Sequence, residues 1–400
     1  MKPIPYGKHN ITEEDIAAVV NVLKSDYLTQ GPKIDEFEKE FAKYVGSKYA
    51  VAVSNGTAAL HLSVLALGLT PGQKVLTTPI TFVASANCIK YCGGEVEFVD
   101  INNQTFLIDI DNVRKILEQS PKNTYAGIIP VNFSGRVVNM EAISELAKEH
   151  GIWIVEDACH SPGGYFFDKQ NQKQSSGNGL FADLSIFSFH PVKHIACGEG
   201  GMITTNNYTL YKKLLKLRSH GIVKENSLFL NKISLTIGKK SSEEVEYPNW
   251  YMEMQDLGYN YRLTDIQAAL GLSQLKRAEV GLSIRKKIAE YYNTAFSELE
   301  QVKTPILQED DSGHAYHLYI LLVENRYELY NHLRKLNIIT QVHYIPAHLM
   351  PYYQNIGYKV GDFPNAEKFY NSCLSIPIYP SLTKIEQDYV IESIINFYKV

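Results

Sequence analysis

The chain has 400 residues, of which 45% are hydrophobic and 20% charged, a composition typical of a folded protein rather than a disordered one. This length is sufficient for two domains with a large core. The formal net charge is −4 with both signs interspersed, so the sequence lacks the basic surface expected of a protein that binds nucleic acid or an anionic membrane. We therefore expect neither partner.

The sequence shows neither a signal-peptide pattern nor a CxxC pair of cysteines. The first residues (MKPIPYGKHNITEEDI) contain no apolar core of signal-peptide length, and no later run approaches the length of a membrane span, so we expect a cytoplasmic protein. Five cysteines form no CxxC pair, which favours neither a disulfide framework nor a zinc site. We expect no bound metal.

The first predicted elements lead to a candidate anion site. Helices are predicted at residues 12–23, where Thr12 and Asp15 fit a capping box, and at 34–44. A strand at 49–53 then runs through the small-residue turn SNGT into a helix at 58–67. Such a turn directs free backbone N–H groups and the positive end of a helix dipole to one point, which would suit a phosphate at Gly56 and Thr57. The same residues also fit a plain tight turn.

The next segments repeat the order strand, helix, strand. Strands are predicted at 74–77, 96–99, 126–131 and 153–155, with helices before Gly93 and at 140–150. This alternation indicates a mainly parallel sheet with helices on both faces, in which ligands collect at the carboxyl ends of the strands. Two features lie at such ends.

One of these features is aromatic and the other acidic. Phe82 lies at a strand-to-helix turn, where its ring could cover a flat cofactor or simply join the core. Glu156 and Asp157 directly follow an apolar strand, and burying a carboxylate alone is costly. A carboxylate there therefore needs a role or a partner.

The stretch 185–201 (SIFSFHPVKHIACGEGG) contains the strongest candidate for chemistry. An apolar strand ends near Pro191 and presents Lys193 among aliphatic and small residues, just before a glycine turn. Burial disfavours the charged form of lysine, and a neutral amine is a nucleophile that can form a Schiff base. A lone lysine more often extends its ammonium to solvent, so the case depends on the other residues of the site.

The remainder of the chain indicates a smaller second domain. A helix at 212–218 is followed by a polar, irregular stretch at 224–250, an insertion or mobile loop, and then by a helix that continues to about residue 275. A long helix at 285–299 precedes an α+β pattern with strands at 317–323 and 339–345 and helices at 327–335 and 384–398. We predict a large domain at 1–270 and a small α+β domain at 271–400.

The candidate residues together match the parts of one cofactor. Pyridoxal 5′-phosphate (PLP) has a phosphate, a flat ring, a ring nitrogen whose proton an acid must hold, and an aldehyde that a lysine can bind. The motifs EDACHS, SIFSFHPVKHIACGEGG and LGYNYRLTDIQAALGLSQL resemble those of the DegT/DnrJ/EryC1/StrS class of sugar-nucleotide aminotransferases, over essentially the whole chain. The resemblance implies the α/β fold of fold-type I PLP-dependent aminotransferases.

The resemblance also implies roles for the cofactor residues. Lys193 corresponds to the lysine that binds PLP covalently as an aldimine and serves as the catalytic acid and base. Asp157 corresponds to the acid on the pyridine nitrogen, and His160 to a neighbour of the ring hydroxyl. The remaining cofactor positions are the stacking ring Phe82, the phosphate contacts Gly56, Thr57 and Ser188, and Asn260, which would reach the phosphate of a partner subunit in a homodimer with composite active sites.

The substrates are implied in the same way. Within the class, TTPITFVASAN, WYMEMQDLGYNYRLTDIQ and QVHYIPAHLMPYY most resemble the UDP-4-amino-4,6-dideoxy-N-acetyl-β-L-altrosamine transaminases of pseudaminic acid biosynthesis. The implied reaction moves the amino group of L-glutamate to C4 of a UDP-linked 4-keto-6-deoxy-N-acetylhexosamine, with ping-pong kinetics. The residues implied to contact the sugar nucleotide are Tyr6, Asp26, Tyr27, Leu28, Thr29, Arg262, Gln341, Val342, His343 and Tyr344.

Several alternatives stay open at this point. Arg262 could hold the donor carboxylate or the diphosphate, or pair with Asp265 on its own helix. The sugar could be the D-xylo epimer, or its carrier dTDP or GDP. A PLP-binding regulator without activity is the rival from another class, although the presence of Lys193, Asp157 and Ser188 argues against it.

Overall fold

A seven-stranded sheet forms the centre of the computed structural model, which describes residues 2–232, 247–305 and 313–399. The strand order is β2-β10-β9-β6-β5-β3-β4, and every neighbouring pair is parallel except the two that involve β10. The mainly parallel sheet predicted from the sequence is therefore confirmed. Its strands are β2 Tyr49–Val53, β3 Lys74–Thr77, β4 Glu95–Phe98, β5 Tyr125–Ile129, β6 Trp153–Asp157, β9 Leu184–Ser188 and β10 Gly201–Thr205.

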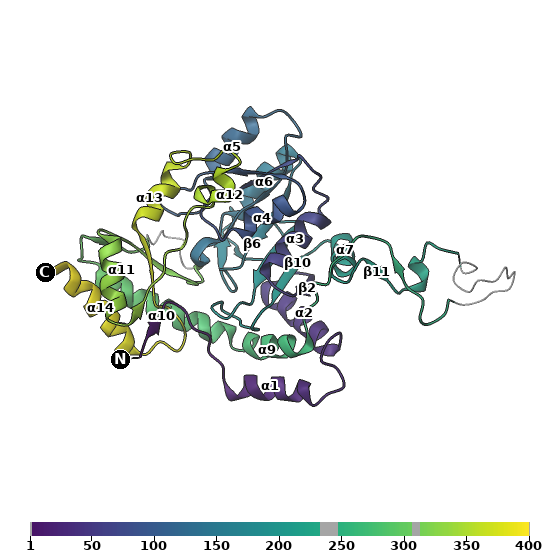
Figure 1. Ribbon diagram of the computed structural model, residues 1–400, viewed down its shortest axis with the longest axis horizontal. Helices are drawn as coiled ribbons and strands as arrows, with labels where there is room; N and C mark the ends of the chain where they lie inside the picture. The colour runs from purple at the N-terminus through teal and green to yellow at the C-terminus, as the bar shows by residue number, and fades with distance from the viewer. Residues whose placement is uncertain (1, 233–246, 306–312, 400) are drawn as a thin grey trace.

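Helices cover both faces of this sheet because its strands are apolar on both sides. In β2, Val51 and Val53 join the core under one group of helices, while Ala50 and Ala52 join the core on the opposite face. The first group is α3 Gly56–Ala66, α4 Ala84–Tyr91 and α7 Tyr208–Arg218. The opposite face carries α2 Pro32–Val45, α5 Ile110–Gln119, α6 Met140–His150 and α9 Asp265–Leu275, with α1 Glu13–Leu23 packed on α9 (Figure 1).

A second, smaller sheet lies at the end of the molecule where both chain termini are found (Figure 1). It consists of β13 Val302–Lys303, β14 Tyr319–Val323 and β16 Cys373–Ile376, all antiparallel. The N-terminal strand β1 Ile4–Pro5 pairs with β15 Ile338–Ile339 beside it. The division of the chain at residue 270 stays a prediction. The helices here are α10 Ala278–Phe296, α11 Arg326–Lys335, α12 Pro351–Gln354, α13 Pro364–Ser372 and α14 Lys384–Lys399.

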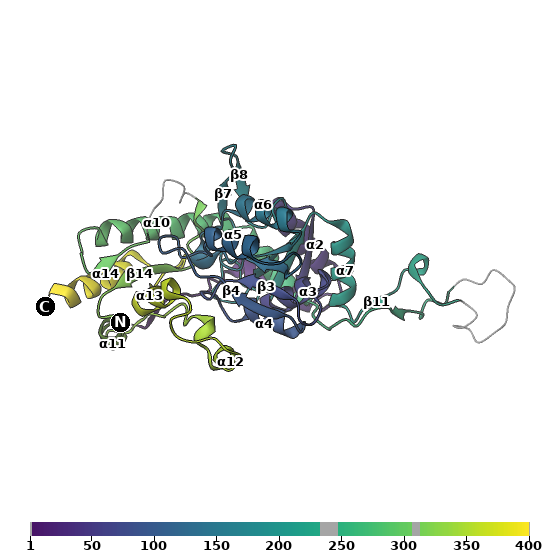
Figure 2. The ribbon, with the colours of Figure 1, turned by 90° about the horizontal axis from the view of Figure 1, so that it is seen from above.

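An arm leaves the body after α7. It begins with β11 Ile222–Val223, which pairs with β12 Glu253–Met254, and it extends away from the sheet in both views (Figures 1 and 2). We define the arm as residues 222–232 and 247–257. The sequence predicted an irregular insertion or mobile loop at 224–250, of which residues 233–246 lie outside the described part of the chain.

One predicted strand, at 339–345, is wrong. The structure has only the short strand β15 there, followed by a single bridge between Gln341 and Ser375. Regular pairing ends because the next side chains turn toward other partners: His343 contacts the Ser375 hydroxyl at 2.9 Å, and the Tyr344 hydroxyl lies 3.3 Å from His160. Pro346, which cannot donate a backbone hydrogen bond, follows directly.

The described ranges contain neither a helix suited to span a membrane nor a cluster suited to bind a metal ion. None of the helices there combines the length and apolar character needed to cross a membrane. Within the same ranges, no group of three or more His, Cys, Asp or Glu side chains is arranged to hold a metal ion.

Candidate active site

Lys193 follows strand β9, at the end of the central sheet where the parallel strands have their carboxyl ends. A turn closed by the Lys193 N–H and the His190 carbonyl, 2.8 Å apart, directs the lysine inward, and its Nζ lies 3.2 Å from Nε2 of His317. Burial lowers the pKa of Lys193 to about 8, partly opposed by the nearby Cys159 and Asp157. A substantial share of this amine is therefore neutral near physiological pH.

Asp157 occupies the last position of β6, the strand next to β9, so it belongs to the strand rather than following it. The side chain is only 5% exposed. Its Oδ2 accepts a 2.6 Å hydrogen bond from the Ser85 hydroxyl, and its Oδ1 accepts one from the Cys159 N–H at 3.1 Å. Both donors are neutral, so these hydrogen bonds stabilise the carboxylate without forming an ion pair.

The small-residue turn after β2 opens onto Ser188. Helix α3 begins at Gly56 and not at residue 58, because Asn55 caps it by accepting a hydrogen bond from the Ala58 N–H at 2.8 Å. A Cβ atom on Gly56 would lie 3.0 Å from the Ser188 Cβ, so a larger residue would crowd this contact. The backbone N–H groups of the first helical turn, which have no carbonyl partner within the helix, thus lie beside a hydroxyl group.

An aromatic and histidine wall stands beside these groups. His160 Nδ1 accepts a hydrogen bond from the Ser134 N–H at 3.2 Å, which leaves Nε2 to carry the proton in the neutral ring, next to the Tyr344 hydroxyl. The ring of Phe82 is 59% exposed and lies 6.4 Å from that of Tyr344, between ring centroids. Tyr6 and His343 are 5.0 Å apart by the same measure.

The histidines of this wall are neutral. Burial, and then the charge of Lys193, keep the pKa of His160 and of His317 well below the usual range, and the same two causes lower the pKa of His343 to about 3. The wall therefore offers uncharged donors and acceptors to a ligand at Lys193.

Other predicted residues lie outside this group of contacts. The loop with Asp26, Tyr27, Leu28 and Thr29 is held at the start of α9, where Thr29 pairs with Thr264. Val342 packs among the partly buried apolar residues, and Asn260 is exposed.

Of the three alternatives left open for Arg262, the structure does not show the pairing with Asp265. Arg262 donates to the Ser219 hydroxyl at 3.0 Å. Asp265 instead accepts hydrogen bonds from the backbone N–H groups of Gly31 and Lys33, at 2.8 and 2.9 Å, because these are the unpaired donors at the start of α2.

Sequence reasoning missed three residues that lie near Lys193, Asp157 or Gly56. His317 contacts Lys193, Ser85 donates to Asp157, and Cys159 lies beside Gly56. Ser85 stands three positions after Phe82 in the first turn of α4, a polar residue in an apolar stretch that could have been noticed. His317 lies just before strand β14, and no local sequence pattern indicates its contact with Lys193.

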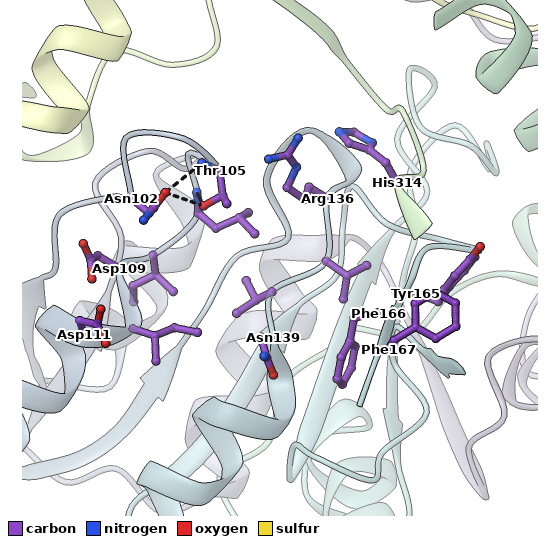
Figure 3. Close-up of a pocket in the computed structure, with 15 residues that line it drawn as sticks. Asn102, Thr105, Asp109, Asp111, Arg136, Asn139, Tyr165, Phe166, Phe167 and His314 are labelled. Carbon is purple, nitrogen blue, oxygen red and sulfur yellow. Dashed lines mark hydrogen bonds between the residues drawn. The ribbon is translucent and has the colours of Figure 1, made fainter. Parts of the chain in front are cut away.

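A separate cavity of about 310 Å³ is lined by residues that include Arg136, Asn139 and His314 (Figure 3). Arg136 and His314 lie at one edge of the cavity, with Asp109 and Asp111 further along it. Ser134 connects the two places, because its hydroxyl lies 3.3 Å from His314 Nε2 while its N–H donates to His160. The cavity contains neither Lys193 nor Asp157 among its lining residues.

Comparison with known proteins defines the class. Residues 9–395 match the DegT/DnrJ/EryC1/StrS aminotransferase family, and the chain belongs to that family. It is a PLP-dependent aminotransferase of the α/β type that the sequence predicted.

Individual relatives are similar over nearly their full length. The spore coat polysaccharide biosynthesis protein SpsC of Bacillus subtilis is 40% identical, covering 99% of this chain and 97% of the relative. The UDP-4-amino-4,6-dideoxy-N-acetyl-beta-L-altrosamine transaminase of Campylobacter jejuni strain 81-176 is 37% identical, covering 98% and 97%.

Solved structures give the same result for the fold. PseC of Helicobacter pylori, an aminotransferase involved in the biosynthesis of pseudoaminic acid, superposes with a TM-score of 0.85 at 29% identity over all of both chains. The PMP form of the putative sugar aminotransferase Spr1654 of Streptococcus pneumoniae has a TM-score of 0.86 at 29% identity, over 99% of both chains.

Proposed function

We propose that this aminotransferase moves the amino group of L-glutamate to C4 of UDP-2-acetamido-2,6-dideoxy-β-L-arabino-hex-4-ulose. The product would be UDP-4-amino-4,6-dideoxy-N-acetyl-β-L-altrosamine, for pseudaminic acid biosynthesis. The similarity to the Campylobacter transaminase and to PseC supports this substrate. Both substrates carry negative charge and cross membranes poorly, which favours a cytoplasmic site of action.

The observation that carries the proposal is the convergence of Lys193, Asp157, Ser188 and the start of α3 at one edge of the sheet. These residues fit PLP: the first turn of α3 and the Ser188 hydroxyl would hold its phosphate, and Asp157 its protonated ring nitrogen. Gly56 leaves the cradle open where a Cβ would crowd Ser188. Phe82 would cover the ring and His160 would lie near the ring hydroxyl.

When bound, PLP supplies the carbon that carries the amino group and a ring that takes up the electrons of the substrate carbanion. Lys193 would hold the cofactor covalently and, once displaced, move a proton away from Cα of glutamate and later back onto C4 of the sugar. Its lowered pKa suits this work, because the amine must accept and release a proton near neutral pH. The neutral His317 would hold the free amine in place.

Substrate contacts follow the same logic. Tyr6, His343 and Tyr344 belong to the wall beside Lys193 and would meet the sugar. Arg262, free of Asp265, would meet the diphosphate or the donor carboxylate. The loop with Asp26, Tyr27, Leu28 and Thr29, together with Gln341 and Val342, would contact the nucleotide.

We further propose a homodimer with composite active sites. The arm exposes large apolar side chains that nothing in the described part of the chain covers, and such surface is costly unless a partner buries it. Asn260 lies just beyond the arm, exposed, where it would reach the phosphate site of the partner. The apolar side chains concerned are Leu228, Leu230, Trp250, Met252, Met254 and Leu257.

The decisive experiment offers the purified enzyme L-glutamate with either the L-arabino or the D-xylo UDP-4-keto sugar and identifies the aminated product. Amination of the L-arabino epimer supports the proposal. Exclusive use of the D-xylo epimer, or of a dTDP- or GDP-linked sugar, would replace it by the corresponding 4-aminotransferase. The Lys193→Ala variant serves as the control, since it should be inactive with every sugar.

A further inference from the structure

A second, smaller cavity of about 80 Å³ is lined in part by Lys193 and its neighbour His194. Its lining is strongly basic: besides apolar and amide groups it contains Lys8, His9, Lys193, His194, Arg277 and Arg285, and no carboxylate among the described residues. It shares Lys193 with the candidate active site, but His160, His343 and Tyr344 are not among its lining residues.

Arg285 presents an uncompensated charge in this cavity. The residue is 1% exposed, and its Nη1 donates to the backbone carbonyls of Tyr316, His317 and Ile378 at 3.1, 3.3 and 2.9 Å. Its Nε has no partner within the described ranges, and no carboxylate there forms an ion pair with it. A buried cation without a counter-charge is costly, so an anion beside it would be stabilising.

Two other residues that line this cavity, Arg277 and His194, each have a buried nitrogen without a hydrogen-bond partner in the described structure. Arg277 bonds through Nη2 to Asp15 and to the Asn10 carbonyl, but its buried Nε also lacks an acceptor in the described structure. His194 contacts the Ala315 carbonyl through Nε2 at 2.8 Å, and its buried Nδ1 has no partner there. Because Nε2 must donate to that carbonyl, Nδ1 of the neutral ring is an acceptor and needs a donor such as water.

We propose that this cavity is a binding site for a small inorganic anion, with chloride as the occupant, accompanied by a water molecule that donates to His194. The buried charge of Arg285, which no carboxylate in the described ranges offsets, accounts for the charge of the ligand, while Arg277, whose charge Asp15 already balances, would supply a second N–H donor through its Nε. The volume of about 80 Å³ exceeds the roughly 10–15 Å³ that a cavity needs to hold one water molecule, so there is room for a chloride ion together with water.

The site would act on the neighbouring lysine. The charge of Arg285 is one of the factors that lower the pKa of Lys193, so an anion beside Arg285 would offset part of that effect. This inference concerns a cavity that shares Lys193 with the candidate active site, and its occupancy by an anion can be tested independently of which sugar the enzyme uses.

Diffraction from crystals of the full-length enzyme soaked in sodium bromide tests occupancy directly. We expect an anomalous peak in the cavity, in contact with Nε of Arg285 or Arg277. A cavity that contains only water under these conditions overturns the proposal, as does bromide bound only at exposed lysines.

Thermal unfolding tests the site in solution. The wild-type Tm should rise saturably with sodium chloride relative to sodium gluconate at equal ionic strength. Gly281→Leu should abolish this chloride-specific rise by filling the cavity. A Cβ at Gly281 would lie 3.5 Å from Pro380, an ordinary contact, so this variant is expected to fold.

Two further variants separate a local from a general effect. Arg285→Met removes the proposed counter-charge and should also abolish the rise; since it could fail to fold, Gly281→Leu decides the matter. Arg334→Met removes an exposed charge on α11 and should keep the full chloride-specific rise. A chloride rise that survives in Gly281→Leu, or that disappears in Arg334→Met, overturns the proposal.

Discussion

Nζ of Lys193 lies 3.2 Å from Nε2 of His317, which precedes strand β14 of the small sheet by two residues. Because burial keeps the pKa of His317 well below its usual range, its ring is neutral and accepts a hydrogen bond from the lysine ammonium. The contact connects the segment after β9 of the central sheet with the segment before β14 of the small sheet. It also gives His317 a positioning role that is open to experiment.

His317→Leu should lower kcat by about 10- to 100-fold with little change in KM, the loss expected for one hydrogen bond to a charged group. Removing the acceptor also disfavours the ammonium, so the pKa of Lys193 should fall further. His317→Gln keeps an acceptor and should restore part of both properties. Steady-state kinetics and amine labelling check these outcomes; a purely structural role for His317 would leave the pKa of Lys193 unchanged.

Amine labelling against pH tests the charge state of Lys193. In the cofactor-free protein, the reaction of Lys193 with an acylating reagent should reach half its maximum near pH 8, since burial lowers its pKa to about that value. Lys169 is the internal control, because its hydrogen bond to Glu145 raises its pKa. Peptide mass spectrometry resolves the two sites, and equal profiles for both would contradict the expected difference.

The lowered pKa of Lys193 also makes the free energy of unfolding depend on pH. The pKa of Lys193 is lower in the folded protein than the 10.5 usual for lysine, so between about pH 8 and 10.5 the unfolded chain binds more protons. The contribution of this group to the free energy of unfolding therefore rises with pH across that window. Subtracting the urea-unfolding profile of Lys193→Met from that of the wild type isolates the effect.

Glu156 and Asp157 are adjacent, yet they point to opposite sides of β6 and have different tasks. Glu156 is buried and accepts hydrogen bonds from Asn132, Ser176, Gly177 and Ser185, at 2.7 to 3.1 Å. Glu156→Gln would place an amide donor against these donors and should cost roughly 1–3 kcal/mol of the free energy of unfolding. Urea unfolding checks this, with the exposed Glu149→Gln on α6 as the control.

This pair also shows how far sequence reasoning extends. Asp157 and Lys193 were found because each ends or follows an apolar strand, and strands of a parallel sheet bring such positions to one edge. Which of the two carboxylates serves the site was not visible from their position alone. It depends on the direction of each side chain and on partners such as Ser176 and Ser185, 20 and 29 positions away.

Contacts between distant segments explain the remaining gaps. His317 is 124 positions from Lys193, and Ser85 is 72 positions from Asp157, so no local pattern links them. Helix 140–150 and strand 74–77 were predicted with the observed limits because periodicity and capping are local. The strand predicted at 339–345 failed because tertiary contacts of His343 and Tyr344 outweigh the strand propensity of that segment.

The arm provides the test of assembly. Trp250 and Leu257 are 69% and 78% exposed, and a dimer partner would bury them. The double variant Trp250→Glu/Leu257→Glu should therefore sediment as a monomer and lose activity, because its active sites would lack the Asn260 of a second subunit. Ile385→Glu, which changes a side chain that is 73% exposed on α14, should remain dimeric and active. Sedimentation velocity with parallel assays measures both properties; a dimeric, active double variant would show that the arm does not hold the subunits together.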